Sequence, residues 1–263
     1  MKNLSKRLFR PLATALAAAL VLSAMAGCSR DGANGTSNPL AAMSGGPTSD
    51  PNAARIALPF VPGDFVAGGT NPFFPLTPGL RYSYREETAE GLETNDVEVT
   101  HDTKVILGVT TTVIRDKVYL EGSLIEDTFD WYAQDKHGNV WYLGEDTKEY
   151  DNGVLVSTAG SWEAGVNGAQ AGIIMLANPK VGDQYYQENA PGVVEDQGKV
   201  LSLKETVSVP YGTFIGCLAT ADWTPIEPGN RTFKYYARGV GLVMEVTPHG
   251  GRERLELVDL SRP

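Results

Sequence analysis

Cysteine and histidine are scarce in this chain, which has two cysteines and three histidines in 263 residues. It contains no Cys-x-x-Cys pair, no His-Glu-x-x-His motif and no Gly-x-Ser-x-Gly elbow, so the usual signatures of redox, zinc and serine-hydrolase chemistry are absent. A hydrolase that uses two carboxylates stays open, because such a pair meets in space and not in sequence. These absences favour a non-catalytic protein without a cofactor.

Basic residues are also few, since 22 Lys and Arg stand against 32 Asp and Glu, a formal net charge of −10. Nucleic-acid binding depends on basic groups that release counterions from phosphates, so we expect no nucleic-acid partner. Anionic membrane surfaces should repel the chain for the same reason.

The N-terminal segment has the order of parts found in a secretion signal. Its four basic residues are Lys2, Lys6, Arg7 and Arg10. They precede an apolar run at 11–26, which is shorter than the roughly 20 apolar residues that span a bilayer as a helix. The run therefore indicates cleavage and export.

The run ends in Leu22-Ser23-Ala24-Met25-Ala26-Gly27-Cys28, which resembles the lipobox of bacterial lipoproteins. In that family the cysteine thiol receives a diacylglyceryl group and a signal peptidase cuts just before it. The resemblance implies that residues 1–27 are a lipoprotein signal peptide and that acylated Cys28, with chains such as palmitate, binds the lipid bilayer. An ordinary secretion signal with an incidental cysteine is the alternative.

Removing residues 1–27 takes away the four basic residues and leaves 18 Lys and Arg against 32 Asp and Glu, a formal charge of −14. The lipid is therefore the expected source of membrane attachment, on the extracytoplasmic side of the cell envelope. Ser29 follows the cysteine, as is usual for lipoproteins sent to the outer membrane of bacteria with two membranes. With Cys28 acylated, Cys217 is left as a small buried apolar residue without a disulfide partner.

Composition divides the rest of the chain into three parts. Residues 28–59 are rich in Gly, Ser, Asn, Ala and Pro and read as a flexible tether. Residues 60–78 alternate prolines, glycines and aromatics and suggest an ordered entry strap. Residues 79–263 are long enough to form one domain with its own core.

Apolar and polar residues alternate with the period of a half-buried strand in this domain. Leu80, Tyr82 and Tyr84 begin the pattern, and segments near 97–101 and 200–209 continue it. In 131–142, Gly138 and Asn139 can take positive φ and predict a hairpin turn. We expect a mainly β fold, an antiparallel meander forming a barrel-like or half-barrel single domain, with one candidate helix near 169–176.

Four segments resemble blocks of exported bacterial β-sheet proteins of the TapB-like group. They are 71–76 before Gly79 and Tyr82, the hairpin at 130–142, 209–214, and 236–243. The resemblance covers most of 71–260 and implies an antiparallel sheet wrapped into a barrel-like or half-barrel shape. It carries no established activity and no catalytic residue.

Acidic residues crowd the segment after Trp141. Glu145, Asp146, Glu149 and Asp151 offer hard oxygen ligands at close spacing, which could hold calcium. Their spacing is not that of an EF-hand loop, and acidic residues at hairpin ends are commonly solvated. The segment could therefore bind calcium, or its acidic residues could be solvated and serve only to keep the protein soluble.

His101, Asp127 and Glu205 fall, by alternation, on the same face as apolar neighbours. Polar groups that face a core need partners, and in a barrel they can line an internal ligand cavity. A one-residue bulge would turn any of them outward.

The leading hypothesis is a membrane-anchored envelope lipoprotein whose non-catalytic β domain binds a partner protein, an apolar ligand or an envelope polymer. An acidic calcium-binding module and a hydrolase acting on an envelope polymer are the alternatives. Sequence does not identify the partner or ligand.

Overall fold

The computed structural model describes residues 55–248 and 253–263, so the predicted signal peptide, Cys28 and most of the predicted tether lie outside the described residues. The described chain is built from strands and one short 3-10 helix, η2 (Pro62–Asp64). The strands are β1 (Phe65–Val66), β2 (Arg81–Thr88), β3 (Gly91–Ile106), β4 (Val109–Leu120), β5 (Ser123–Asp135), β6 (Val140–Asp151), β7 (Val154–Ser157), β8 (Trp162–Glu163), β9 (Gly172–Met175), β10 (Gln184–Tyr186), β11 (Gln197–Val209), β12 (Gly212–Trp223), β13 (Arg231–Ala237), β14 (Gly241–Thr247) and β15 (Glu253–Ser261).

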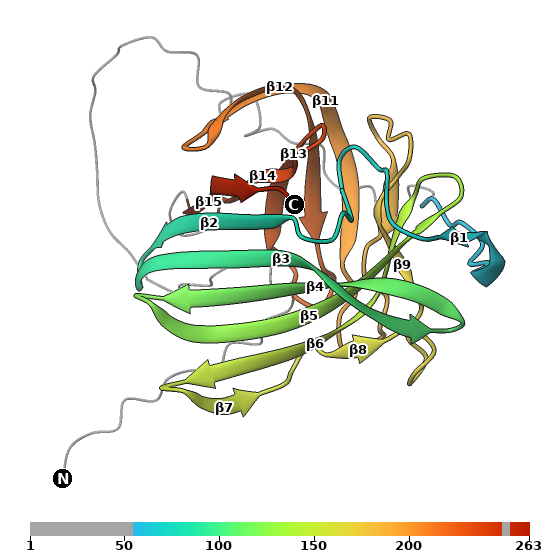
Figure 1. Cartoon of the computed structure of the whole chain (residues 1–263), viewed down its shortest axis with the longest axis horizontal. Helices are drawn as coiled ribbons and strands as arrows, with labels where there is room; N and C mark the ends of the chain where they lie inside the picture. The colour runs from blue at the N-terminus through green and yellow to red at the C-terminus, as the bar shows by residue number, and fades with distance from the viewer. Residues whose placement is uncertain (1–54, 249–252) are drawn as a thin grey trace.

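These strands form one antiparallel sheet in the order β10-β11-β12-β13-β14-β15-β2-β3-β4-β5-β6-β7. The N-terminal and C-terminal parts of the chain meet in the middle of this order, where β15 pairs with β2. Figure 1 shows β2 to β6 crossing the front of the molecule and β11 to β13 running steeply behind them. The expected antiparallel, barrel-like β fold is confirmed, but the pairing of the described strands does not close into a barrel.

The outer edge of β6 is covered by three short strands in turn. Its start pairs with β9, its middle with β8 and its end with β7. Unpaired backbone groups are costly when buried, so these short segments complete the hydrogen bonding of a strand that lies deep in the molecule. The predicted helix near 169–176 is therefore wrong: Gly172–Met175 is a buried strand, because pairing with β6 outweighs local preference.

Alternation predicted the inner face of β2 correctly. Tyr82 and Tyr84 are buried, while Arg81 and Arg85 are exposed. The two phenols donate hydrogen bonds to the carbonyl oxygens of Val240 and Leu242 across the rolled sheet, at 2.9 and 3.0 Å. The sheet thus encloses a core with Tyr185, Leu143, Met175, Leu218 and Leu257 among its fully buried side chains.

The segment before β2 is tied onto the sheet by Asn71. Its side-chain amide donates to the carbonyl oxygens of Gly138 and Leu176, at 2.9 and 3.1 Å, and its Oδ1 accepts from the N–H of Phe73. The buried side chains of Phe73 and Leu76 then join the core. This fixed segment holds the residues before it against the β5–β6 turn.

Candidate functional site

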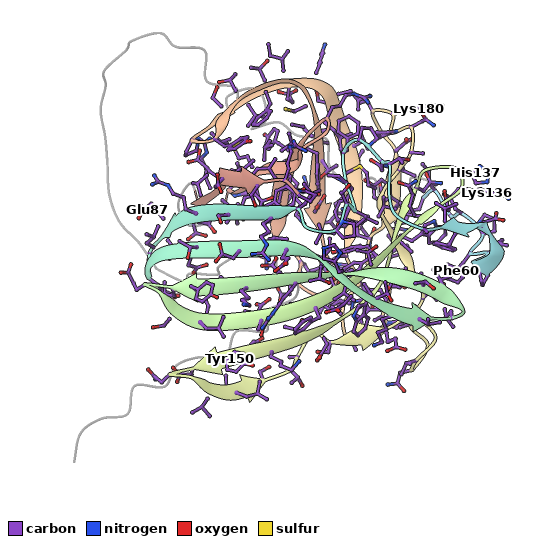
Figure 2. All side chains as sticks on the ribbon, in the orientation of Figure 1. Phe60, Glu87, Lys136, His137, Tyr150 and Lys180 are labelled. Carbon is purple, nitrogen blue, oxygen red and sulfur yellow. The ribbon has the colours of Figure 1, made fainter. Side chains whose placement is uncertain are left out.

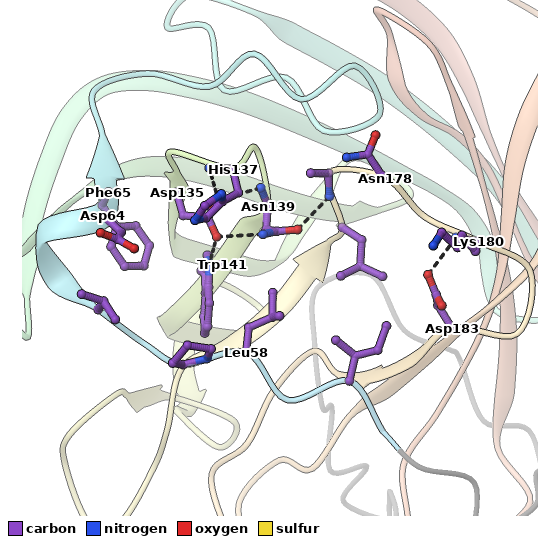
Figure 3. Close-up of a pocket in the computed structure, with 15 residues that line it drawn as sticks. Leu58, Asp64, Phe65, Asp135, His137, Asn139, Trp141, Asn178, Lys180 and Asp183 are labelled. Carbon is purple, nitrogen blue, oxygen red and sulfur yellow. Dashed lines mark hydrogen bonds between the residues drawn. The ribbon is translucent and has the colours of Figure 1, made fainter.

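A pocket of about 470 Å³ lies where three segments distant in sequence meet (Figure 3). The segments are residues 56–65, the β5–β6 turn at 135–141, and the loop at 176–183. Its apolar wall includes Ile56, Leu58, Phe65, Trp141 and Leu176. Volume and lining match those of small-ligand sites, which are mainly apolar with a few fixed polar groups.

The Asp135 carboxylate organises the turn at the base of this pocket. Oδ1 accepts from the backbone N–H groups of His137 and Asn139, at 2.8 and 3.0 Å. Oδ2 accepts from Asn139 Nδ2 and Trp141 Nε1, at 2.8 and 3.0 Å. Burial alone would raise the pKa of Asp135, but the hydrogen bonds from Trp141, Asn139 and His137 outweigh it and lower the pKa below its usual value. Asp135 is therefore ionised at neutral pH and holds Trp141 in place.

Asn139 joins the turn to the third segment of the pocket. Its Oδ1 accepts from the N–H of Ala177 at 2.9 Å, while its Nδ2 is held by Asp135 (Figure 3). Farther along the loop, the N–H of Lys180 donates to Asp183 at 2.8 Å. The polar groups on this side are thus fixed before any ligand arrives, which lowers the ordering cost of binding.

An aromatic cluster fixes the first segment. The Phe60 ring lies 5.1 Å from that of Phe65 and 5.5 Å from that of Trp141, centroid to centroid, and the latter pair is edge-to-face. Such pairs contribute roughly 0.5–1.5 kcal/mol beyond area burial. Asp64 beside them pairs with Lys136 at 2.8 Å. The wall formed by residues 56–65 is therefore anchored to the β5–β6 turn by both rings and charge.

Charged side chains of both signs lie at the rim, because Asp64 and Asp183 line the pocket as well as Lys180. His137 and Lys180 are exposed and line the pocket, and Figure 2 shows them with Lys136 on the same side of the molecule. Apolar walls below a polar rim suit a ligand with an apolar body and a polar end.

A second feature is a row of carboxyl groups on the inner face of β4, β5 and β6. Glu126 lies opposite Glu149 and Asp130 opposite Glu145, with Asp116 on the other side of β5 opposite Thr128. The Tyr142 hydroxyl contacts Asp130 and lies 3.1 Å from Glu145 Oε2. Like charges that face each other on adjacent strands repel, so this row favours neutral acids.

The pKa values of these carboxyls follow from that environment. Burial is the main cause in each case, and it raises the pKa of Glu126 and of Asp130 to about 7. Burial and the neighbouring Asp130 also raise the pKa of Asp116 and of Glu145 well above the ordinary range. Apart from the half-buried Glu149, the row is buried, and it does not line the open pocket.

The three predicted cavity residues are not brought together. His101 is exposed, because a register irregularity between Val99 and Thr103 turns the strand there, and its predicted core-facing position is wrong. Asp127 lies on the opposite face from Glu126 and makes a bidentate ion pair with Arg115, at 2.8 and 2.7 Å. Glu205 is half-buried on β11 between two register shifts, and none of the three lines the pocket.

The four predicted calcium ligands do not gather either. Glu145 is buried on the inner face, Asp146 points the other way and pairs with Lys148 at 2.6 Å, and Asp151 is exposed at the end of β6. Glu149 is half-buried opposite Glu126. Within residues 55–248 and 253–263, no group of three or more His, Cys, Asp or Glu side chains is placed to hold a metal ion.

The remaining predicted site residue is Cys28, the predicted lipidation site, and it lies outside the described residues.

Cys217 is buried and free, and burial raises the pKa of its thiol, as expected for an unreactive cysteine. In the part of the chain that the structure describes, no helix has the length and apolarity needed to cross a bilayer.

Sequence reasoning missed the pocket residues Asp135, Asn139 and Trp141. The signal was present, because an Asp that begins a turn commonly accepts hydrogen bonds from the residues after it. The turn was predicted from Gly138 and Asn139, and of these two only Gly138 takes a positive φ, +93°. Its packing against residues 56–65 and 176–183 involves contacts that no local pattern reports.

Comparison with known proteins finds similarity among solved structures. One is a protein from Bacteroides fragilis that is described as exported and as having a YmcC-like fold. Its sequence is 15% identical, the match covers 73% of this chain and 100% of that chain, and the TM-score is 0.45. Another, from Parabacteroides distasonis, is described as a lipoprotein; it is 13% identical, with 73% and 99% covered and a TM-score of 0.40. No family model and no curated protein matches the sequence, so membership of the TapB-like group stays a prediction.

Proposed function

We propose that this protein is a lipid-anchored protein of the cell envelope whose β domain binds, without catalysis, a ligand with an apolar body and a polar end. The pocket between residues 56–65, 135–141 and 176–183 is the observation that carries this proposal. The signal-like N-terminus and Cys28 support the location.

The chemistry of the pocket supports binding rather than turnover. The Asp135 carboxylate accepts four hydrogen bonds from its own turn, so its lone pairs are committed to holding Trp141 and Asn139. The other carboxylates on the lining also have protein partners: Asp64 pairs with Lys136, and Asp183 accepts from the N–H of Lys180. Binding affinity would come mainly from apolar contact with Leu58, Phe65 and Trp141.

The test uses the fluorescent dye anilinonaphthalene sulfonate, which has an aromatic body and an anionic group. We expect saturable binding to the folded protein, and we expect Leu58→Glu to weaken it at least about tenfold, since a charge on the apolar wall costs more than about 1.4 kcal/mol. Ala177→Trp, which fills the pocket without adding charge, should do the same. Val154→Glu is the matched control, because Val154 is 64% exposed on β7 and does not line the pocket.

Circular dichroism of each variant checks that the fold is kept. Unchanged dye affinity in a folded Ala177→Trp protein would refute the pocket as the binding site. Equal weakening by Val154→Glu would do so as well, because the dye would then report general surface binding.

The anchor is tested separately with Cys28→Ser in the full chain. We expect the wild-type protein to enter the detergent phase in phase separation and to incorporate labelled palmitate, and the variant to do neither, because buried acyl chains supply about 0.8 kcal/mol per CH₂. Retention of Cys28→Ser in the detergent phase would show that the attachment has another source.

A further inference from the structure

A buried lysine lies between two carboxyl groups at the centre of the C-terminal half of the sheet. Lys234 on β13 is flanked by β12, which carries Asp222, and by β14, which carries Glu245 directly opposite it. Figure 1 shows these three strands side by side. The Lys234 Nζ atom lies 3.1 Å from Asp222 Oδ2, and the two side chains are 9% and 7% exposed. Of the described lysines and arginines, Lys234 alone is buried.

The surroundings of this pair are buried, and some of their polar atoms have no hydrogen-bond partner. Tyr185 and Tyr236 are buried and close enough to influence both charges. Gln187 Nε2 donates to Asp222 Oδ2 at 3.3 Å, whereas Asp222 Oδ1 and Glu245 Oε2 are buried without a hydrogen-bond partner. An ion pair in such a place recovers little of its desolvation cost, so conversion to an uncharged product is favoured.

The protonation states add to this picture. Burial lowers the pKa of Lys234, but Asp222 and Glu245 outweigh it and raise the pKa above its ordinary value. Burial raises the pKa of Glu245 to about 8 despite Lys234 nearby. At neutral pH Lys234 is therefore an ammonium and Glu245 a carboxylic acid that can relay a proton.

We propose that Lys234 and Asp222 condense into an intramolecular isopeptide bond that joins β13 to β12. The bond between Nζ and Cγ forms and the bond between Cγ and Oδ1 breaks. The ammonium gives up two protons, and these leave with Oδ1 as one water molecule. No oxidant, reductant or cofactor takes part in this step.

Each neighbouring group has a defined part in the reaction. Oδ2 is retained as the amide oxygen, and the donor Gln187 Nε2 stabilises the negative charge that builds up there in the tetrahedral intermediate. Glu245 lies directly opposite Lys234 and interacts electrostatically with both Lys234 and Asp222, so it is the group assigned to protonate the leaving oxygen and then to take up a proton from Nζ, and it ends unchanged. The buried setting keeps out the water that would favour the reverse reaction.

The bond would join β12 to β13 covalently and would enclose the connection between them, residues 223–230. It would add to the backbone hydrogen bonds that already pair the two strands. Cys217 is the one cysteine in the part of the chain that the structure describes, so no disulfide can serve this purpose there. A covalent link that closes a loop stabilises mainly by restricting the unfolded chain. The inference does not rest on the pocket or on its ligand.

The experiment is peptide mass spectrometry of the purified full chain, denatured and digested with trypsin. Trypsin cleaves after Lys204, Arg231 and Arg238 and does not cleave after a lysine whose Nζ is acylated. We expect a branched peptide in which 205–231 is joined to 232–238. Its mass equals that of the linear peptide 205–238, so fragmentation identifies it by its two N-termini and by the link between Lys234 and Asp222. Recovery of 232–234 and 235–238 as separate peptides, with no branched product, would show an ion pair only and overturn the proposal.

Variants separate the parts of the mechanism. Lys234→Met and Asp222→Ala remove a reacting atom and should abolish the branched peptide. Glu245→Gln keeps the shape of the side chain but cannot relay a proton, so the branched peptide should be lost in a folded protein. Glu126→Gln, a change to another buried acid, should retain it; equal yields in the Glu245→Gln and Glu126→Gln proteins would overturn the part assigned to Glu245.

Discussion

Replacing Glu126 by Gln should make the protein more stable in mildly alkaline solution than the wild type. Glu126 is 1% exposed; its Oε1 accepts from the Thr128 hydroxyl at 2.9 Å, and its Oε2 has no hydrogen-bond partner. Burial raises its pKa from 4.5 to about 7, Thr128 opposes the rise, and Asp130, Glu149 and Glu93 add to it. The native state therefore holds a proton there that the unfolded chain releases.

The size of the effect follows from linkage between proton binding and folding. Because the folded-state pKa is raised, the stabilising contribution of the protonated acid is fully present below about pH 4.5 and is lost as the pH rises to about 7. At about 1.4 kcal/mol for each pH unit between the two pKa values, the loss is roughly 3 kcal/mol. Between about pH 5 and about pH 8.5, most of it, about 2–3 kcal/mol, should be observed.

Glu126→Gln removes this titration, because an amide stays neutral at both pH values. Thermal unfolding followed by circular dichroism should show the melting temperature of the variant rising relative to the wild type by about 5–10 °C on going from about pH 5 to about pH 8.5. Asp151→Asn, at an exposed position of β6, is the control and should show no such change. A difference between Glu126→Gln and wild type that is the same at both pH values would refute the buried neutral acid.

Two further substitutions test the packing and the pocket turn. Gly172→Ala should destabilise strongly or prevent folding, because an added Cβ would lie 2.1 Å from the Gln187 carbonyl oxygen, whereas an added Cβ at Gly212 meets nothing within 4 Å. In urea unfolding, the midpoint of Gly172→Ala should fall at a clearly lower urea concentration than that of Gly212→Ala. Asp135→Ala leaves Trp141 Nε1 and two backbone N–H groups without their acceptor and should cost about 3 kcal/mol at neutral pH. Since the pKa of Asp135 is lowered on folding, the wild-type advantage should shrink as the pH falls through the acid range, and an advantage that is constant down to about pH 2 would count against the ionised carboxylate.

Local pattern was sufficient for much of the fold. Alternation placed Tyr82 and Tyr84 inside, and Gly138 marked the β5–β6 turn, because side-chain alternation and positive φ are properties of a few adjacent residues. The same reasoning failed at His101, where a register irregularity reversed the face of the strand. It also failed at 172–175, where a helix was predicted. This apolar run has no alternation that distinguishes helix from strand, and its pairing with β6 makes it a strand.

The sequence by itself determined that the chain is acidic, rich in strands and turns, poor in thiols, and headed by a signal-like segment that ends at Cys28. Only the tertiary structure decided which acids are buried together and which residues form a pocket. Glu126 and Glu149, or Asp222 and Lys234, become neighbours through strand register. Alternation says which side chains share a face; rolling the sheet decides which face is closed to water, and there a carboxyl group changes from a solvated charge into a neutral acid.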